Sequence, residues 1–303
     1  MKKIITVVVF IAITITTHAC DVCGCRAGND GLGILPRFNR HFVGVRYNYS
    51  PFRSQHLTLF ENEVPIHSEE KFHTYTVWGR YVPHQRVQVF AFLPYNSVIQ
   101  HIEGKTNRIE GFGDAVLMAN YVLFNTTDSM QKGRLKHALQ AGGGVKLPTG
   151  ASDIKQDGLL INPNLQPGTG ATDVLLNMLY TVRIKKFGIN AEASYTLRTE
   201  NANYYKFGNR FSGGLRGYYR KTFGVTTLLP SVAATYDFAD LDSDLGKKID
   251  YTGTKMLSAS GGLDVYYKSF AVSTGIKIPL AGTMGGSYIT QKTSYSASII
   301  YLF

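Results

Sequence analysis

The chain lacks the features of a helical membrane protein. After its amino terminus, no segment holds about 18 consecutive apolar residues, so membrane-spanning helices are excluded. It has one Trp, 17 % charged residues and three cysteines, which all lie within CDVCGC at residues 20–25. Any structure that crosses a membrane here must therefore consist of strands.

Tyr, Phe and Gly are plentiful instead, with 19, 17 and 31 residues in a chain of 303. This composition suits many short strands and turns better than a helical bundle. A near-neutral hydropathy is compatible with a membrane, because a barrel strand shows only alternate residues to lipid. The formal charge of +11 suits nucleic acid, anionic lipid or anionic solutes. The basic residues form no stripe or known module, so we expect no nucleic-acid partner.

The first 19 residues have the order of a secretory signal peptide. Lys2 and Lys3 precede an apolar stretch at 4–15, and small or polar residues follow at 16–19. The apolar stretch is shorter than a membrane-spanning helix. We therefore expect residues 1–19 to direct export and to be removed.

The cysteine cluster that follows allows several interpretations. Cleavage after Ala19 would leave Cys20 at the amino terminus, either unmodified or lipidated, although Thr17 stands where a lipoprotein signal usually has a Leu-like residue. A disulfide fits Cys20 and Cys23 better than Cys23 and Cys25, which are too close for an unstrained bridge. Alternatively, Cys20, Cys23 and Cys25 bind a soft metal ion, with copper as Cu(I) the candidate, or undergo redox exchange.

From residue 41 to the end, apolar and polar residues alternate as in strands with one apolar face. The clearest run places Ile189, Ala191 and Tyr195 on one face and Asn190 and Glu192 on the other. Such runs are about as long as a tilted strand that crosses a membrane. The pattern predicts twelve strands, at 41–50, 71–82, 86–94, 113–124, 136–147, 172–183, 187–198, 205–220, 223–237, 255–267, 269–280 and 293–303.

The connections between these strands alternate between tight turns and longer loops. The connection at 125–135 falls where the pattern predicts a tight turn, but it is longer than one. The longer loops are expected at 51–70, 95–112, 148–171, 199–204, 238–254 and 281–292. This rhythm is typical of a transmembrane antiparallel up-and-down β-barrel. We therefore predict an all-β barrel of about twelve strands at 41–303, in one domain after a Cys-containing segment at 20–40. An even strand number places both termini in the periplasm of an outer-membrane protein.

The carboxyl terminus carries a specific feature. Tyr301 and Phe303 end one face of the last predicted strand. A terminal Phe with an aromatic residue two positions before it resembles the signal that the bacterial barrel-assembly machinery recognises. Outer-membrane lipid and this machinery are thus expected partners. The main structural alternative is a secreted β-sandwich.

Several longer motifs resemble one family. They are GFGDAVLMANYVLF at 111–124, AGGGVKLPTG at 141–150, NPNLQPGTGATD at 162–173 and YKFGNRFSGGL at 205–215. Together with the closing strand and the CDVCGC start, they resemble the outer-membrane transporters grouped under the phenol-degradation meta-pathway name, in their Bacteroidetes-like branch. The resemblance implies uptake or export of small molecules and supplies no catalytic residues. The Cys-rich start implies a link to copper handling or electron transfer.

If the apolar face meets lipid, the other face lines the lumen. This assigns ten basic and four acidic residues to the lumen: Arg46, Arg80, Arg86, Lys136, Lys146, Arg198, Lys206, Arg210, Arg216 and Lys277, with Asp114, Asp173, Glu192 and Asp264. A net positive lumen predicts a channel or transporter for small polar or anionic solutes. The alternatives are a closed interior in which these charges pair and a copper-linked or structural outer-membrane protein that uses the cysteines.

An enzyme is not expected. No Ser lies in a GxSxG setting. The histidines of the predicted loops, among them His56, His67 and His101, have spacings that match no strong metal-binding pattern.

Overall fold

The computed structural model describes residues 40–56, 65–126, 135–156 and 158–303. The predicted signal peptide at 1–19 and the cluster of Cys20, Cys23 and Cys25 lie outside the described residues, so those predictions stay open. No helix in the described ranges is long and apolar enough to cross a membrane.

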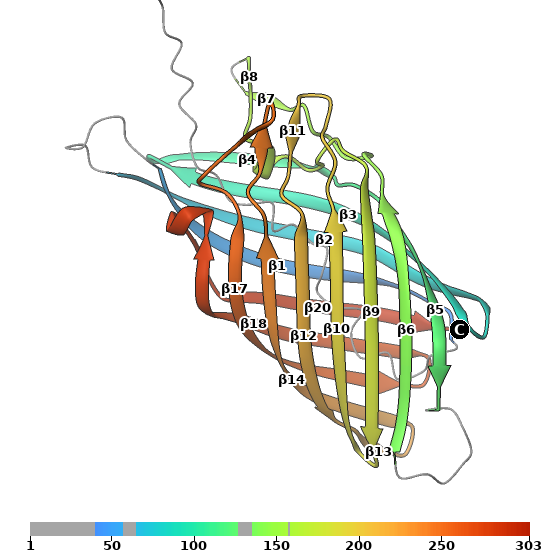
Figure 1. Cartoon of the computed structure of the whole chain (residues 1–303). Helices are drawn as coiled ribbons and strands as arrows, with labels where there is room; N and C mark the ends of the chain where they lie inside the picture. The colour runs from blue at the N-terminus through green and yellow to red at the C-terminus, as the bar shows by residue number, and fades with distance from the viewer. Residues whose placement is uncertain (1–39, 57–64, 127–134, 157) are drawn as a thin grey trace, which may run out of the picture.

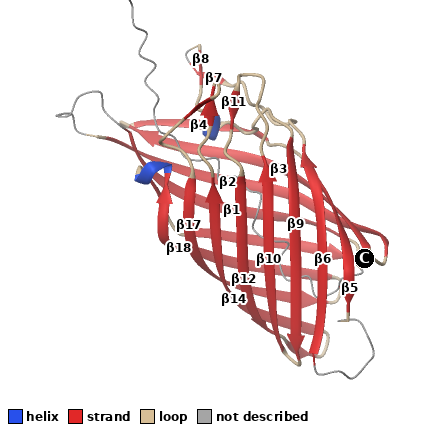
Figure 2. Ribbon diagram, viewed as in Figure 1, coloured by secondary structure: helices blue, strands red, loops and turns tan. Residues whose placement is uncertain are grey.

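Twelve long strands of the described chain form one closed antiparallel barrel (Figures 1 and 2). Each pairs with its neighbours along the chain, and β1 closes the barrel against β20 through a register from Phe42–Leu302 to Tyr49–Tyr295. The predicted fold class is thus confirmed. The strands are β1 (Phe42–His56), β2 (Ile66–His84), β3 (Val87–Ile102), β5 (Val116–Asn125), β6 (Leu135–Lys146), β9 (Asp173–Ile184), β10 (Phe187–Leu197), β12 (Arg210–Tyr219), β14 (Thr226–Ala239), β17 (Thr254–Tyr267), β18 (Phe270–Met284) and β20 (Ser294–Leu302).

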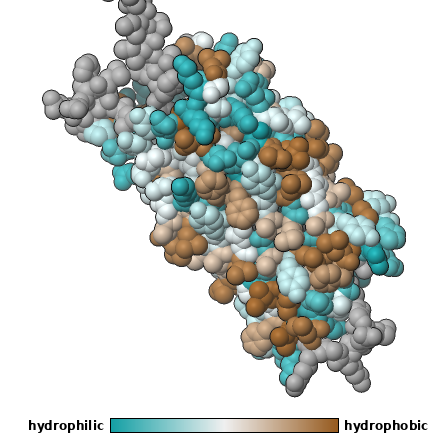
Figure 3. Space-filling model, viewed as in Figure 1, coloured by the Kyte–Doolittle hydropathy of each residue, from teal (hydrophilic) through white to brown (hydrophobic). Residues whose placement is uncertain are grey.

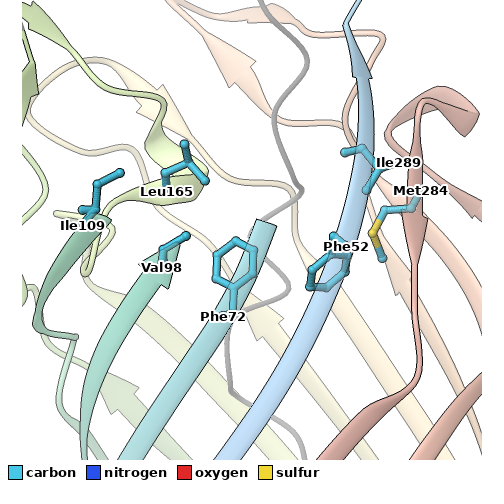
Figure 4. Packing of buried hydrophobic residues seen from close by; sticks show 7 residues of the cluster. All are labelled: Phe52, Phe72, Val98, Ile109, Leu165, Met284 and Ile289. Carbon is cyan, nitrogen blue, oxygen red and sulfur yellow. The ribbon is translucent and has the colours of Figure 1, made fainter. Parts of the chain in front are cut away.

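Short elements extend the wall at the long-loop end, where the sequence predicted loops. β4 (Lys105–Phe112) forms a hairpin with β3, and β19 (Ile289–Gln291) pairs with β1. β1 and β2 also run on, so they fill much of the predicted loop 51–70. These extensions bury apolar side chains in a cluster that Figure 4 shows: Phe52, Phe72, Val98, Ile109, Leu165, Met284 and Ile289. Burial of this cluster explains why the strands continue.

The remaining short elements lie in the connections. β7 (Lys155–Gln156) pairs with β8 (Leu159–Leu160), and the 3-10 turns are η1 (Pro163–Leu165) and η2 (Gly285–Ser287). A separate sheet contains β11 (Tyr205–Lys206), β15 (Ser243–Asp244) and β16 (Lys247–Lys248). β13 (Lys221–Phe223) pairs with the start of β14. The predicted strand 205–220 therefore joins the barrel only from Arg210.

The two faces of the wall differ as the alternation predicted. Val43, Val45 and Ile299 are roughly half exposed on the outer face, where Figure 3 shows apolar residues over the barrel strands. A cluster at the tight-turn end lies inside instead: Phe42, Trp78, Phe90, Ala271, Ile300 and Leu302. Alternate exposure of apolar residues is the pattern of a strand that crosses a bilayer.

Candidate functional site in the lumen

A cavity of about 170 Å³ lies within the barrel, and we call it the lumen cavity. Its lining includes Arg46 of β1, Lys146 of β6 and Glu192 of β10, which come from widely separated parts of the wall. Asp114 and Arg198 also line it, so its lining has three basic and two acidic residues. Five of the residues that the sequence assigned to the inner wall therefore meet around one space.

The connection between β6 and β9, described at 147–156 and 158–172, covers one side of the lumen cavity with its later part. Its Pro163, Gln166 and Pro167 belong to the lining. The Gln166 amide is buried and holds the segment together, because it accepts from Ile154 N–H and donates to the carbonyls of Ile154 and Ile161. The sequence predicted a loop here, but nothing in the period-two pattern indicated that it would line the lumen.

Two polar side chains of the wall hold this connection. The Asn96 Nδ2 donates to the Pro167 carbonyl at 2.9 Å. Asp114, between β4 and β5, accepts from Gly150 N–H at 3.0 Å, from Thr169 N–H at 2.8 Å and from the Thr169 hydroxyl at 2.7 Å. Hydrogen bonds to an ionised carboxylate are stronger than hydrogen bonds to a neutral acceptor.

Next to this anchor, buried charges form a chain. Lys146 Nζ lies 3.1 Å from Asp114 Oδ2 and 2.7 Å from Asp173 Oδ2, and it also contacts the Thr169 hydroxyl. Arg198 Nη1 lies 2.7 Å from the same Asp173 oxygen. Asp173 is 0 % exposed. Buried charges must be paired to be tolerated. The carboxylates of Asp114 and Asp173 therefore neutralise part of the positive charge that Lys146 and Arg198 bring to the lumen.

A second charged group connects three strands. Asp237 of β14 lies 3.1 Å from Arg210 Nη2 of β12 and 3.0 Å from Lys277 Nζ of β18. Asp237 was missed as an inward residue. The signal available in the sequence was the alternation of β14, because Asp237 lies six residues, or three alternations, after Ser231 and therefore on the same face.

Towards the tight-turn end, aromatic rings accompany two arginines. The Arg46 guanidinium lies 4.3 Å from the centroid of the Trp78 ring, and Phe92 stacks on Trp78 at 5.8 Å. Arg80 is 2 % exposed, donates to the Arg40 carbonyl and lies over Phe42. Arg guanidinium groups stack favourably on aromatic faces.

The other predicted lumen residues are more dispersed. Arg216 donates to Ser231 at 3.3 Å, and Asp264 pairs in register with Ser273. Lys136 lies opposite Arg183, close to the start of β6. These positions do not belong to the lining of the lumen cavity.

Two predicted lumen residues lie off the inner wall. Arg86 is exposed in the tight turn after β2 and donates to the Tyr121 hydroxyl of the outer face, because the register shifts between Tyr81 and His84. Lys206 belongs to β11 in the separate small sheet, because the chain joins the barrel only later. Within the described ranges, no group of three His, Cys, Asp or Glu residues is placed to hold a metal ion.

Fold and lumen together define the class of protein, which is a transmembrane β-barrel of the outer-membrane type. The fold is similar to that of an outer-membrane channel from Pseudomonas putida F1, with a TM-score of 0.66, 14 % identity, and coverage of 88 % of this chain and 96 % of that one. It is also similar to the β domain of the Bordetella autotransporter BrkA, with a TM-score of 0.51, 13 % identity, and coverage of 88 % and 100 %. No protein-family profile and no curated sequence matches the chain.

Proposed function

We propose that this protein is an outer-membrane channel or transporter for small polar or anionic solutes, with both termini in the periplasm. The observation that carries the proposal is the lumen cavity, where Arg46, Lys146 and Arg198 outnumber Asp114 and Glu192. Rings of like charge in a narrow pore select for the opposite charge. The pairing of Lys146 and Arg198 with Asp173 reduces this preference without removing the charge of Arg46 from the lining.

The proposal is tested by reversal potentials in a planar bilayer across a salt gradient. We expect a preference for anions, and a smaller one in Arg46→Gln. Arg86→Gln removes the same charge from an exposed turn outside the lumen, so it should leave the reversal potential unchanged. Cation preference, or absent conductance in well-folded protein, would contradict the proposal.

The sequence CDVCGC supports a second proposal, in which Cys20, Cys23 and Cys25 bind copper. Three closely spaced thiolates suit a soft ion. Replacing all three with Ser should abolish copper binding by the purified full chain and lower the copper tolerance of cells that carry it. If both stay unchanged, the cysteines have no role in metal binding.

A further inference from the structure

The lumen cavity combines charge with an extensive apolar wall. Phe92, Met118 and Leu179 line it, and each shares the inward face of its strand with residues of the buried interior. Leu175 and Phe207 extend the apolar lining. A small inorganic anion gains nothing from such a wall, whereas an apolar group loses its contact with water there. The wall therefore has the chemistry of a binding site for a solute that carries an apolar group.

From this arrangement we propose that the lumen cavity binds organic monoanions with an apolar body, such as medium-chain carboxylates. The Arg46 guanidinium takes the carboxylate, and Phe92, Met118 and Leu179 contact the body. The inference rests on the proposed function for the route by which the solute reaches the cavity. Binding itself does not require that the solute crosses the barrel.

Arg46 is suited to this role by its position. Its guanidinium lies 4.3 Å from the Trp78 ring, and Trp78 stacks on Phe92, so the cation adjoins the apolar wall. Stacking on a ring uses the face of the guanidinium, whereas its five N–H donors point outward in the guanidinium plane. The same group can therefore stack on Trp78 and donate hydrogen bonds to more than one acceptor. Among the three basic residues of the lining, Arg46 is the one that ring contacts connect to Phe92, so we assign the headgroup to Arg46.

Gly144 creates part of the apolar wall. A Cβ at Gly144 would lie 2.5 Å from Met118 Cγ. Met118 can therefore lie across the wall only because its neighbour on β6 has no side chain. Met is flexible and fills irregular apolar sites, which suits contact with solutes of different shape.

The chain contains its own reporter for this site, because Trp78 is its one Trp. Trp78 fluorescence of the folded full-length protein should be titrated with acetate, butanoate and hexanoate, and with hexan-1-ol as the neutral probe. We expect affinity to rise about fourfold per added methylene until the cavity is filled. Hexanoate should bind about tenfold or more tightly than hexan-1-ol, because its charge is hydrogen-bonded in the site.

Variants separate the two parts of the site, with titration calorimetry as a readout independent of Trp78. Arg46→Gln should lower hexanoate affinity about tenfold and leave hexan-1-ol unchanged. Met118→Gln should flatten the dependence on chain length. Val122→Thr, on the same face of β5 but outside the lining, is the matched control and should behave as the parent.

The inference is overturned if affinity does not depend on chain length. It is also overturned if hexanoate and hexan-1-ol bind with equal affinity, both to the parent and to Arg46→Gln. That second result would indicate partition into the detergent alone. Failure of the proposed function gives a different result. If the protein conducts no anions but hexanoate binds through Arg46, the binding site stands without a channel. If anions pass but chain length has no effect, the channel stands without this site.

Discussion

Asp114 accepts two hydrogen bonds from Thr169, one from the backbone N–H at 2.8 Å and one from the hydroxyl at 2.7 Å. These bonds join the barrel wall to the segment that covers the lumen cavity, and Lys146 lies within 3.1 Å of the same carboxylate. Asp114 is therefore, with Asn96, one of the two wall side chains that hold the covering segment.

Asp114→Asn should release this covering segment. Removal of the charge weakens hydrogen bonds that are worth about 1.5–3 kcal/mol each. Of the two carboxylates that Lys146 contacts, only Asp173 then remains. We expect a higher mean conductance and more frequent transitions in single-channel records. Asp153→Asn removes an exposed charge from the same connection and is the control. Identical records for D114N and the parent would show that the segment does not limit the current.

Asp237 should contribute strongly to barrel stability through Arg210 and Lys277. Its replacement with Asn leaves two cations close together without a carboxylate between them. Breaking a buried pair in this way costs about 3–5 kcal/mol, measured as the free energy of unfolding in denaturant. Asp237→Asn combined with Lys277→Met should recover part of the loss. No difference between the single and double variants would mean that the ion pairs do not interact energetically.

Asp242 should make the connection between β14 and β17 sensitive to pH. Burial raises the pKa of the Asp242 carboxyl, although Tyr205 and Gly208 donate to it at 2.6 and 2.7 Å. A carboxyl with a raised folded-state pKa binds its proton more tightly when folded. Local stability is therefore greatest below the unfolded-chain pKa of about 3.9 and falls as pH rises through the folded-state pKa.

Hydrogen exchange over residues 240–253, corrected for intrinsic rates, measures this pH dependence. In Asp242→Asn the neutral amide can still accept from Gly208, so protection should become nearly independent of pH. Equal pH dependence in the parent and the variant would assign the effect to another group.

Gly142→Ala should destabilise the barrel. A Cβ there would overlap the Ala119 carbonyl and Asn120 Oδ1, and the backbone carbonyl cannot move aside as a side-chain end can. Overpacking of this kind typically costs about 1–3 kcal/mol. Gly217→Ala, where a Cβ meets nothing within 4 Å, should unfold like the parent protein. Equal loss in both variants would point to a general effect of replacing Gly in a strand.

Phe303 is expected to act in assembly rather than in stability. It is exposed, and its ring stacks on His41 and Tyr301 at the barrel rim. Phe303→Ala should reduce the amount in the outer membrane several-fold while refolding in detergent is unchanged. Phe270→Ala, an exposed Phe near the same rim, should assemble normally. Equal amounts of F303A and the parent in the membrane would exclude the signal.

Local pattern was sufficient to predict the barrel. The side-chain period of a strand is two, so the alternation around Val43 and Val45 predicts both the strand and the face that meets lipid. The strand number and the antiparallel order follow from the same pattern, because neighbours along the chain pair through short turns. For the same reason Arg46, Lys146 and Glu192 could be assigned to the inner face before any contact was known.

Only the tertiary structure decided which of these side chains meet. Asp237 joins partners 27 and 40 residues away, and Asn96 reaches a carbonyl 71 residues along the chain. Alternation specifies a face, but register and barrel closure decide which residues share a height in the lumen. The connection at 147–172 had no period to reveal its place; it lines the lumen because Asp114, Asn96 and its own Gln166 satisfy its backbone there.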